Sequence, residues 1–211
     1  SELGSDGVAD VDAVLTTREA AKLIRMRGLD FSSMPPASAD TPFGKRSSAG
    51  KIFGATGGVM EAALRTAYHM LTGEELGSLE VTAVRGMDGV KVAGFEIAGV
   101  QVNVAVANGL ANAKALLEDI RSGKRKDIHF IEVMTCPGGC VAGGGQPLDT
   151  DTGSIKARMQ ALYKIDGEAE VRTSHNNEAV QDLYKDFLGK PLGEKSHHLL
   201  HTNYAERKVL K

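Results

Sequence analysis

The two cysteines of this 211-residue chain, Cys136 and Cys140, are separated by three residues. Gly138 and Gly139 lie between them, and three more glycines follow at 143–145. Thiolates are the usual ligands of iron–sulfur clusters, and glycines let a backbone approach such a cluster closely. The same pair could instead form a tight disulfide or serve as two ordinary buried or redox cysteines. The spacing alone leaves cofactor ligation and these simpler roles open.

A second glycine-rich segment, Phe53-Gly-Ala-Thr-Gly-Gly58, comes directly before a predicted helix. Backbone N–H groups at the start of a helix can bind an anion. However, the nearest match to a phosphate-binding loop, from Gly44 to Lys51, has five residues between its glycines instead of four, and Ile52 replaces the required Ser or Thr. The dinucleotide pattern G-x-G-x-x-G is absent as well. A tight turn at the start of the helix is therefore favoured over a phosphate site.

Histidines provide a weaker signal for a metal site. His197 and His201 stand four residues apart on the last predicted helix, so they should share one face. Such a pair can bind zinc, but the Glu of H-E-x-x-H is missing, which favours a solvated or capping role. His175 follows Ser174 at what looks like an ordinary helix start. The serine-hydrolase motif G-x-S-x-G is absent.

The composition, with 42% hydrophobic and 25% charged residues, is that of an ordinary globular protein. A net charge of −2 disfavours nucleic acid as a partner, because nucleic-acid binding needs a basic face. No apolar run approaches the ~20 residues of a membrane span, so no membrane partner is expected. The acidic first residues lack the apolar core of a secretory signal. Together with free thiols, these features predict a cytoplasmic location.

Apolar patterning predicts strands and helices that alternate along the chain, and hence the α/β class with a helical C-terminal third. We expect a proline-containing surface loop over 32–48. Strands are expected at 11–15, 81–84, 90–97, 100–106 and 128–134. Helices are expected at 16–26, from 59 onward, and at 110–121, 154–165, 177–188 and 194–204.

Residues 134–147, Met-Thr-Cys-Pro-Gly-Gly-Cys-Val-Ala-Gly-Gly-Gly-Gln-Pro, closely resemble the last cysteine motif of the iron-only (FeFe) hydrogenases. Five other segments resemble the same family, in family order: 10–19, 53–65, 84–89, 104–110 and 191–202. The resemblance covers nearly the whole chain. It implies that residues 1–211 are the C-terminal portion of the catalytic domain: one lobe, with a small, mostly parallel sheet flanked by helices.

The resemblance also implies a reaction and a cofactor. Family members reversibly reduce protons to dihydrogen at the H-cluster, a 4Fe–4S cubane joined to a two-iron unit that bears CO and cyanide. By this resemblance, Cys136 ligates the cubane, and Cys140 bridges the cubane and the two-iron unit. Met134 would pack beside the two-iron unit, and Phe53 would line the same cavity.

The glycines of the motif also fit this interpretation. Gly139, Gly143 and Gly144 would let the backbone wrap an inorganic cluster. N–H contacts from this backbone to the cluster sulfurs would then tune its potential.

The cysteine count departs from the family pattern. A cubane needs four ligands, and the two earlier cysteine motifs of the family are missing. The second of them would lie shortly before Asp10, so we expect a chain truncated on its N-terminal side and inactive alone. The expected partners are the missing N-terminal part of the catalytic domain, ferredoxin or another electron carrier, and maturation proteins. Apolar surface that the missing part would cover predicts self-association.

Two other functional classes stay open at this point. The first is a catalytically silent relative of the iron–sulfur assembly type, which shares the fold. The second is a simple metal or redox module built on the cysteine pair. Met134 and the run 143–147 favour a true hydrogenase, and three intervening residues do not match the two of a thioredoxin-type motif.

Overall fold

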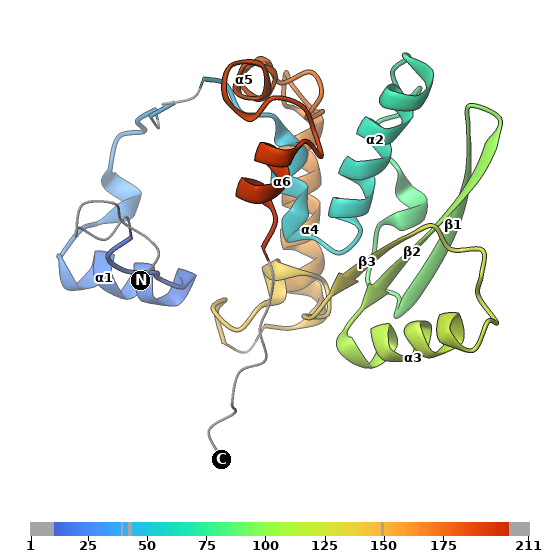
Figure 1. The fold of residues 1–211 in the computed structure, drawn as a ribbon. Helices are drawn as coiled ribbons and strands as arrows, with labels where there is room; N and C mark the ends of the chain where they lie inside the picture. Colours follow the sequence, from blue (N-terminus) through green and yellow to red (C-terminus); the bar gives the residue numbers. More distant parts are fainter. Residues whose placement is uncertain (1–10, 39, 42–43, 149, 203–211) are drawn as a thin grey trace.

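The computed structural model describes residues 11–38, 40–41, 44–148 and 150–202. It confirms the α/β class, with a three-stranded sheet flanked by helices and a helical C-terminal third (Figure 1). The sheet order is β1-β2-β3. Its strands are β1 (Val90–Ile97), β2 (Val100–Asn108) and β3 (Phe130–Met134).

The expectation of a mostly parallel sheet is wrong, because the sheet contains one antiparallel and one parallel pairing. β1 and β2 form an antiparallel hairpin whose turn at Ala98 and Gly99 uses positive φ angles of 53° and 76°. β2 and β3 are parallel and are connected by α3 (Leu110–Arg121). Asn108 pairs with Met134, so both parallel strands end at the same edge of the sheet. Loops that follow this carboxyl edge are where open α/β sheets usually place their sites.

The central strand β2 is buried on both faces by two different helices. Val104 and Val106 face α2 (Gly58–Thr72), where they pack with Met60 and Leu64. On the opposite face, the alanines at 105 and 107 pack with Ala113 and Leu116 of α3. The alternation follows from the period of two in a strand. These two layers fix the edge of the sheet from which residues 135–145 start. We call this segment, which carries Cys136 and Cys140, the cysteine loop.

Three helices form the C-terminal third, namely α4 (Thr152–Gly167), α5 (Glu178–Leu183) and α6 (Glu194–Leu200). The side chain of Asp151 caps α4 by accepting from Ser154 N at 2.7 Å. Asn177 caps α5 in the same way, and a wider π-helical turn continues it over Tyr184–Leu188. The expected last helix ends at Leu200, and residues 203 and 204 lie outside the described residues.

Two expected strands are wrong. Residues 11–15 are not in a strand, and Val14 is 87% exposed. Thr82–Val84 forms a 3-10 helix instead of a strand. Its apolar character has another cause, because Val81 and Val84 pack into the core beside α2. The surface loop expected from 32 is largely exposed where it is described, although Pro42 lies outside the described residues.

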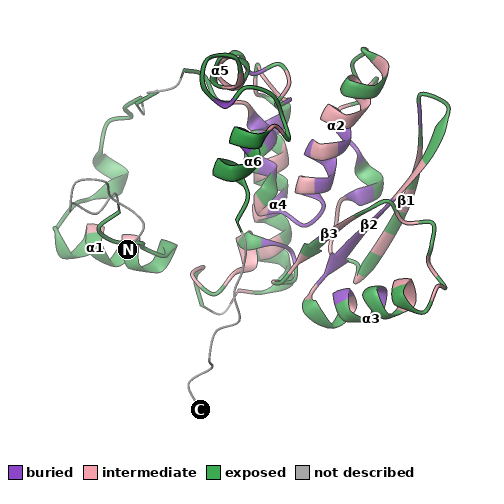
Figure 2. Ribbon diagram, viewed as in Figure 1, coloured by how far each residue is buried: buried purple, intermediate pink, exposed green. Residues whose placement is uncertain are grey.

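Helix α1 (Thr17–Met26) stands apart from the body of the molecule (Figure 1) and buries none of its residues (Figure 2). Thr16 and Glu19 form a capping box at its start. The guanidinium of Arg18 donates to the carbonyl of Gly144 at 2.8 Å, which ties the helix to the cysteine loop. The apolar side chains that α1 and the segment after it leave exposed include Leu23, Met26, Leu29 and Phe31.

A buried ionic network connects α2 to α4. Arg65 of α2 lies 2.6 Å from Glu61 and 2.8 Å from Asp166 of α4, and all three side chains are fully buried. Arg85 and Arg172 add ion pairs to Glu61 and Asp166 from less buried positions. Charges so far from water must be paired and hydrogen-bonded. The network therefore holds α4 against α2, the helix that covers one face of the sheet.

Within the described part of the chain, no helix combines the length and the apolar character needed to cross a membrane.

Candidate functional site

The cysteine loop starts where β3 ends, at the carboxyl edge of the parallel strands. Cys136 is half-buried and Cys140 is exposed, and both are free thiols. Cys140 opens the short 3-10 helix Cys140–Ala142. Met134, the last residue of β3, is half-buried, and its carbonyl accepts from Gly109 N at 2.7 Å. Because both thiols are free, the structure does not contain the disulfide that the sequence left open.

The two glycine-rich segments predicted from the sequence lie against each other. Gly138 and Gly139 have φ angles of 93° and 97°, which favour glycine. A Cβ on Gly139 would lie 2.6 Å from the carbonyl oxygen of Gly54 and 2.8 Å from Thr56 N. Thr56 N also donates to the carbonyl of Gly138 at 3.1 Å. The cysteine loop is thus held directly against the turn that starts α2.

Asn108, the last residue of β2, binds both the cysteine loop and the turn at the start of α2. Its side chain is buried, and Oδ1 accepts from Gly138 N at 2.9 Å and from Thr56 Oγ1 at 3.2 Å. Its Nδ2 donates to the carbonyl of Met87 at 2.7 Å. One amide side chain therefore connects the cysteine loop, the start of α2 and the loop before β1.

The backbone N–H groups at the start of α2 donate hydrogen bonds to a carboxylate of the protein itself. Glu132 of β3 is buried and accepts from Gly57 N at 2.6 Å and from Met60 N at 2.7 Å. Burial raises the pKa of Glu132, while these two backbone hydrogen bonds oppose the rise. Because the N–H groups that would bind an external anion already bind Glu132, the tight-turn interpretation is favoured here by the structure as well.

The three glycines after Cys140 face different surroundings. A Cβ on Gly143 would lie 3.9 Å from the sulfur of Cys136, so this backbone passes close to the thiol. Beside Gly144, no described atom lies within 4 Å of such a Cβ. A Cβ on Gly145 would meet the Cβ of Thr16 at 2.8 Å, next to α1. The loop is thus packed at its base and open at Gly144.

Phe53 directly precedes the part of the glycine-rich segment that packs against the cysteine loop. It belongs to the 3-10 helix Ser48–Gly54 and is 45% exposed. The next residue, Gly54, is the one whose carbonyl faces Gly139. The fold therefore brings Phe53, Met134 and the two cysteines to one edge of the sheet, although the roles predicted for them remain predictions.

The sequence did not identify Asn108, Glu132 or Arg18 as residues that build the loop. Asn108 lies between the strand expected at 100–106 and the helix expected at 110–121, and the chain turns there, at Gly109. Its buried side chain is the unexpected feature. A polar residue directly after a run of alternating valines was the only available signal.

Two interpretations of histidines are also tested. The rings of His197, in α6, and His201, the residue after its end, stack at 4.5 Å, so the two side chains lie on the same side as expected. The interpretation of His175 as part of an ordinary helix start is incomplete, because its ring stacks on His69 at 4.2 Å and lies 3.0 Å from a Glu75 oxygen.

Two family models match the chain, one for each of its main segments. Residues 1–144 match the iron only hydrogenase large subunit, C-terminal domain. Residues 152–207 match the iron hydrogenase small subunit. The boundary between the two matches lies between the cysteine loop and α4.

Curated relatives include hydrogenases and iron–sulfur assembly proteins. An NADP-reducing hydrogenase subunit of Solidesulfovibrio fructosivorans is 48% identical over 99% of this chain. Iron hydrogenase 1 of Clostridium pasteurianum is 44% identical over 97% of it, and a periplasmic hydrogenase large subunit of Nitratidesulfovibrio vulgaris is 49% identical over 70%. A cytosolic iron-sulfur assembly component of Rattus norvegicus is 33% identical over 92%.

The apo form of an FeFe-hydrogenase from Chlamydomonas reinhardtii has a similar structure, with a TM-score of 0.73 and 42% identity over 93% of this chain and 55% of that one. The chain spans about a third of the length of the curated hydrogenases, 36% for the first two. Matches to both family models and identities well above 30% agree with the cysteine motif. The chain therefore belongs to the iron-only hydrogenase family.

Proposed function

We propose that this chain supplies the C-terminal part of the catalytic domain of a hydrogenase that reversibly reduces protons to dihydrogen. The observation that carries the proposal is the cysteine loop, in which two free thiols lie on a glycine backbone packed against the turn before α2. Relatives named as hydrogenases are also more similar to the chain, at 44–49%, than the assembly component at 33%. This difference favours a true hydrogenase over the silent class.

In this proposal, Cys136 and Cys140 hold the H-cluster, which supplies the metal centre where protons and electrons combine. Cys136 would ligate the cubane, and Cys140 would join it to the two-iron unit. The donor set suits such a group, because thiolates are the ligands of iron–sulfur clusters. Gly143 passes close to the Cys136 sulfur and the backbone at Gly144 is open, so no packed side chain covers the loop at Gly144.

Other residues of the loop would shape the cavity. Met134 and Phe53 are proposed as apolar walls that keep water from the two-iron unit. Gly139 is proposed as the point where the loop turns past the start of α2, since a side chain there would collide with Gly54. Asn108 fixes the Gly138 N–H and with it the path between the two cysteines.

Two cysteines supply only half of the four ligands that a cubane requires. We therefore propose that the remaining ligands come from an N-terminal part of the catalytic domain, and that this chain alone does not produce hydrogen. The exposed apolar side chains of α1 are a candidate contact for that part. Ferredoxin or another electron carrier and maturation proteins are the other proposed partners. The cytoplasm is the proposed location, since both cysteines are free thiols.

A chimera tests this proposal. In Iron hydrogenase 1 of Clostridium pasteurianum, this chain would replace the segment that matches it, and the chimera would be produced with maturation proteins. Hydrogen evolution from a reduced dye is then measured for the chimera, for its Cys140→Ser variant and for Lys114→Ala. Lys114 is an exposed residue of α3, with a side chain 78% exposed, and serves as the control.

The proposal predicts hydrogen evolution by the chimera and by Lys114→Ala, and none by Cys140→Ser or by this chain alone. A folded chimera that binds a cubane but evolves no hydrogen would favour the silent iron–sulfur class instead. Hydrogen evolution by this chain without any added polypeptide would contradict the proposal that ligands are missing.

A further inference from the structure

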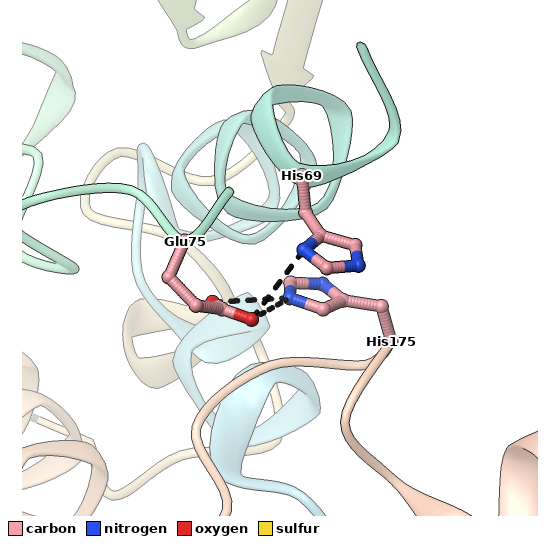
Figure 3. A group of neighbouring side chains, drawn as sticks. All are labelled: His69, Glu75 and His175. Atoms are coloured by element: carbon pink, nitrogen blue, oxygen red, sulfur yellow. Dashed lines mark hydrogen bonds and ion pairs between the residues drawn. The ribbon is translucent and has the colours of Figure 1, made fainter. Parts of the chain in front are cut away.

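Two histidines and a glutamate meet at the end of α2 that lies away from the cysteine loop. His69 is in the last turns of α2, Glu75 follows the helix, and His175 comes from the loop before α5 (Figure 3). A Glu75 oxygen lies 3.0 Å from His175 Nε2 and 3.5 Å from His69 Nδ1. The three potential ligand atoms all lie within 4.8 Å of one another. Segments about 100 residues apart in sequence thus place metal-binding atoms around one point.

One of these atoms has no hydrogen-bond partner. His69 Nδ1 is buried and receives or donates no hydrogen bond within the described residues, because its approach to Glu75 lacks hydrogen-bond geometry. A buried polar atom without a hydrogen-bond partner destabilises the folded state. Such an atom calls for an explanation, and an unassigned ion is one of the usual ones. A cation next to Nδ1 would satisfy its lone pair.

The other two ligands are held in position by neighbours. His175 Nδ1 lies 3.2 Å from the hydroxyl of Thr66, so Nε2 is the nitrogen that faces Glu75. Asn176 Nδ2 donates to Glu75 at 2.9 Å, and this hydrogen bond is the main reason that the pKa of Glu75 is lowered. Metal-binding histidines usually bond their second nitrogen to a neighbouring group in this way.

Metal binding requires the two stacked imidazole rings to change their orientation. The planes of His69 and His175 are nearly parallel, with an interplanar angle of 8°. For both nitrogens to reach one ion, the rings must tilt toward each other. His69 is 36% exposed and Glu75 is 49% exposed, so both side chains have room to move toward the well-buried His175.

We propose that His69, Glu75 and His175 bind one Zn²⁺ ion, with water in a fourth position. Two imidazoles and a carboxylate are a common three-residue ligand set for zinc. His69 and Glu75 belong to the segment that matches the large-subunit model, and His175 to the segment that matches the small-subunit model. The ion would therefore join these two segments and stabilise the docking of the C-terminal helices on α2.

The test is a titration of the full chain with Zn²⁺ alone, followed by calorimetry and by thermal unfolding. Cys136 and Cys140 are alkylated first, because free thiolates would compete for zinc. The variants are His175→Gln and Glu75→Gln, with Thr66→Val as a test of positioning. The matched control is the double variant His197→Gln/His201→Gln, which removes the other stacked pair of histidines.

The expected result is one Zn²⁺ per alkylated chain and a Tm that rises with zinc and falls again with a chelator. His175→Gln and Glu75→Gln should lose this binding, the control should keep it, and Thr66→Val should weaken it about 10- to 100-fold. Circular dichroism checks that each variant is folded. If His175→Gln does not fold, Glu75→Gln still tests the site, because it leaves both stacked rings in place.

The proposal is overturned if the alkylated wild-type chain binds no zinc stoichiometrically. It is equally overturned if binding survives in a folded His175→Gln or Glu75→Gln variant, whether or not the His197→Gln/His201→Gln variant binds zinc.

Discussion

The side-chain oxygen of Asn108 accepts a hydrogen bond of 2.9 Å from the backbone N–H of Gly138, midway between the two cysteines. Asn108 ends β2 and is buried, so this bond fixes the cysteine loop to the buried end of the central strand. Thr56 bonds to the same oxygen, which places the start of α2 in the same frame. A residue outside the loop thus fixes the path of the backbone between Cys136 and Cys140.

Replacing Asn108 by Leu should destabilise the protein strongly. The change leaves the Gly138 N–H and the Met87 carbonyl without their partner, and it should lower the free energy of unfolding by about 2–4 kcal/mol. Asn103→Leu is the matched control, because Asn103 lies on the same strand but is only half-buried. Urea unfolding of both variants measures the difference. Equal stabilities for the two variants would contradict the role assigned to Asn108.

Replacing Gly139 by Ala should be costly for a steric reason. The new Cβ would lie 2.6 Å from the Gly54 carbonyl, at a φ of 97° that side chains rarely adopt. Overpacking and the left-handed backbone together should lower the free energy of unfolding by about 2–4 kcal/mol. Gly144→Ala is the control, since its Cβ would meet no described atom within 4 Å. If both alanine variants unfold at the same urea concentration, the close packing at Gly139 is not required.

The stability of the chain should fall in acid because of Asp166. Burial raises the pKa of this carboxyl, but hydrogen bonds from Arg65, Ser48 and Arg172 outweigh burial and lower it from 3.8 to about 2. The folded state therefore binds the proton more weakly than the unfolded state. The resulting stabilisation of about 2 kcal/mol is complete above pH 4 and is lost as the pH falls toward 2.

Urea unfolding of the wild type and of Asp166→Asn between pH 5 and pH 2 tests this contribution. The variant should be less stable at pH 5 by about 3–5 kcal/mol, because Arg65 keeps its charge and loses a buried partner. Its stability should also fall less steeply below pH 4. An unchanged slope in the variant would show that other carboxylates cause the acid sensitivity.

The elements that border the site were largely predictable from local patterns. Alternating valines predicted β1 and β2, and the apolar run into Cys136 predicted β3, because a strand buries its side chains with a period of two. The run at 81–84 misled the same reasoning. Val81 and Val84 are apolar because they pack beside α2, and a short apolar run does not by itself distinguish a strand from a buried turn.

Contacts between distant segments could not be predicted in this way. The spacing of Glu61 and Arg65 suggests a pair on one helix face, but nothing local indicates that Asp166, about 100 residues later, completes it. The group of His69, Glu75 and His175 depends on the same docking of the C-terminal helices. Such groups form only once the tertiary packing exists, so neither periodicity nor motif spacing reveals them.

The most direct test of the central claim is the infrared spectrum of the matured chimera, since CO and cyanide on the two-iron unit absorb where protein does not. The proposed bridging role of Cys140 predicts these bands in the chimera and in its Lys114→Ala control. It predicts that they are absent from a folded Cys140→Ser variant. The same bands at full strength in Cys140→Ser would contradict the assignment of the cysteine loop as half of the H-cluster site.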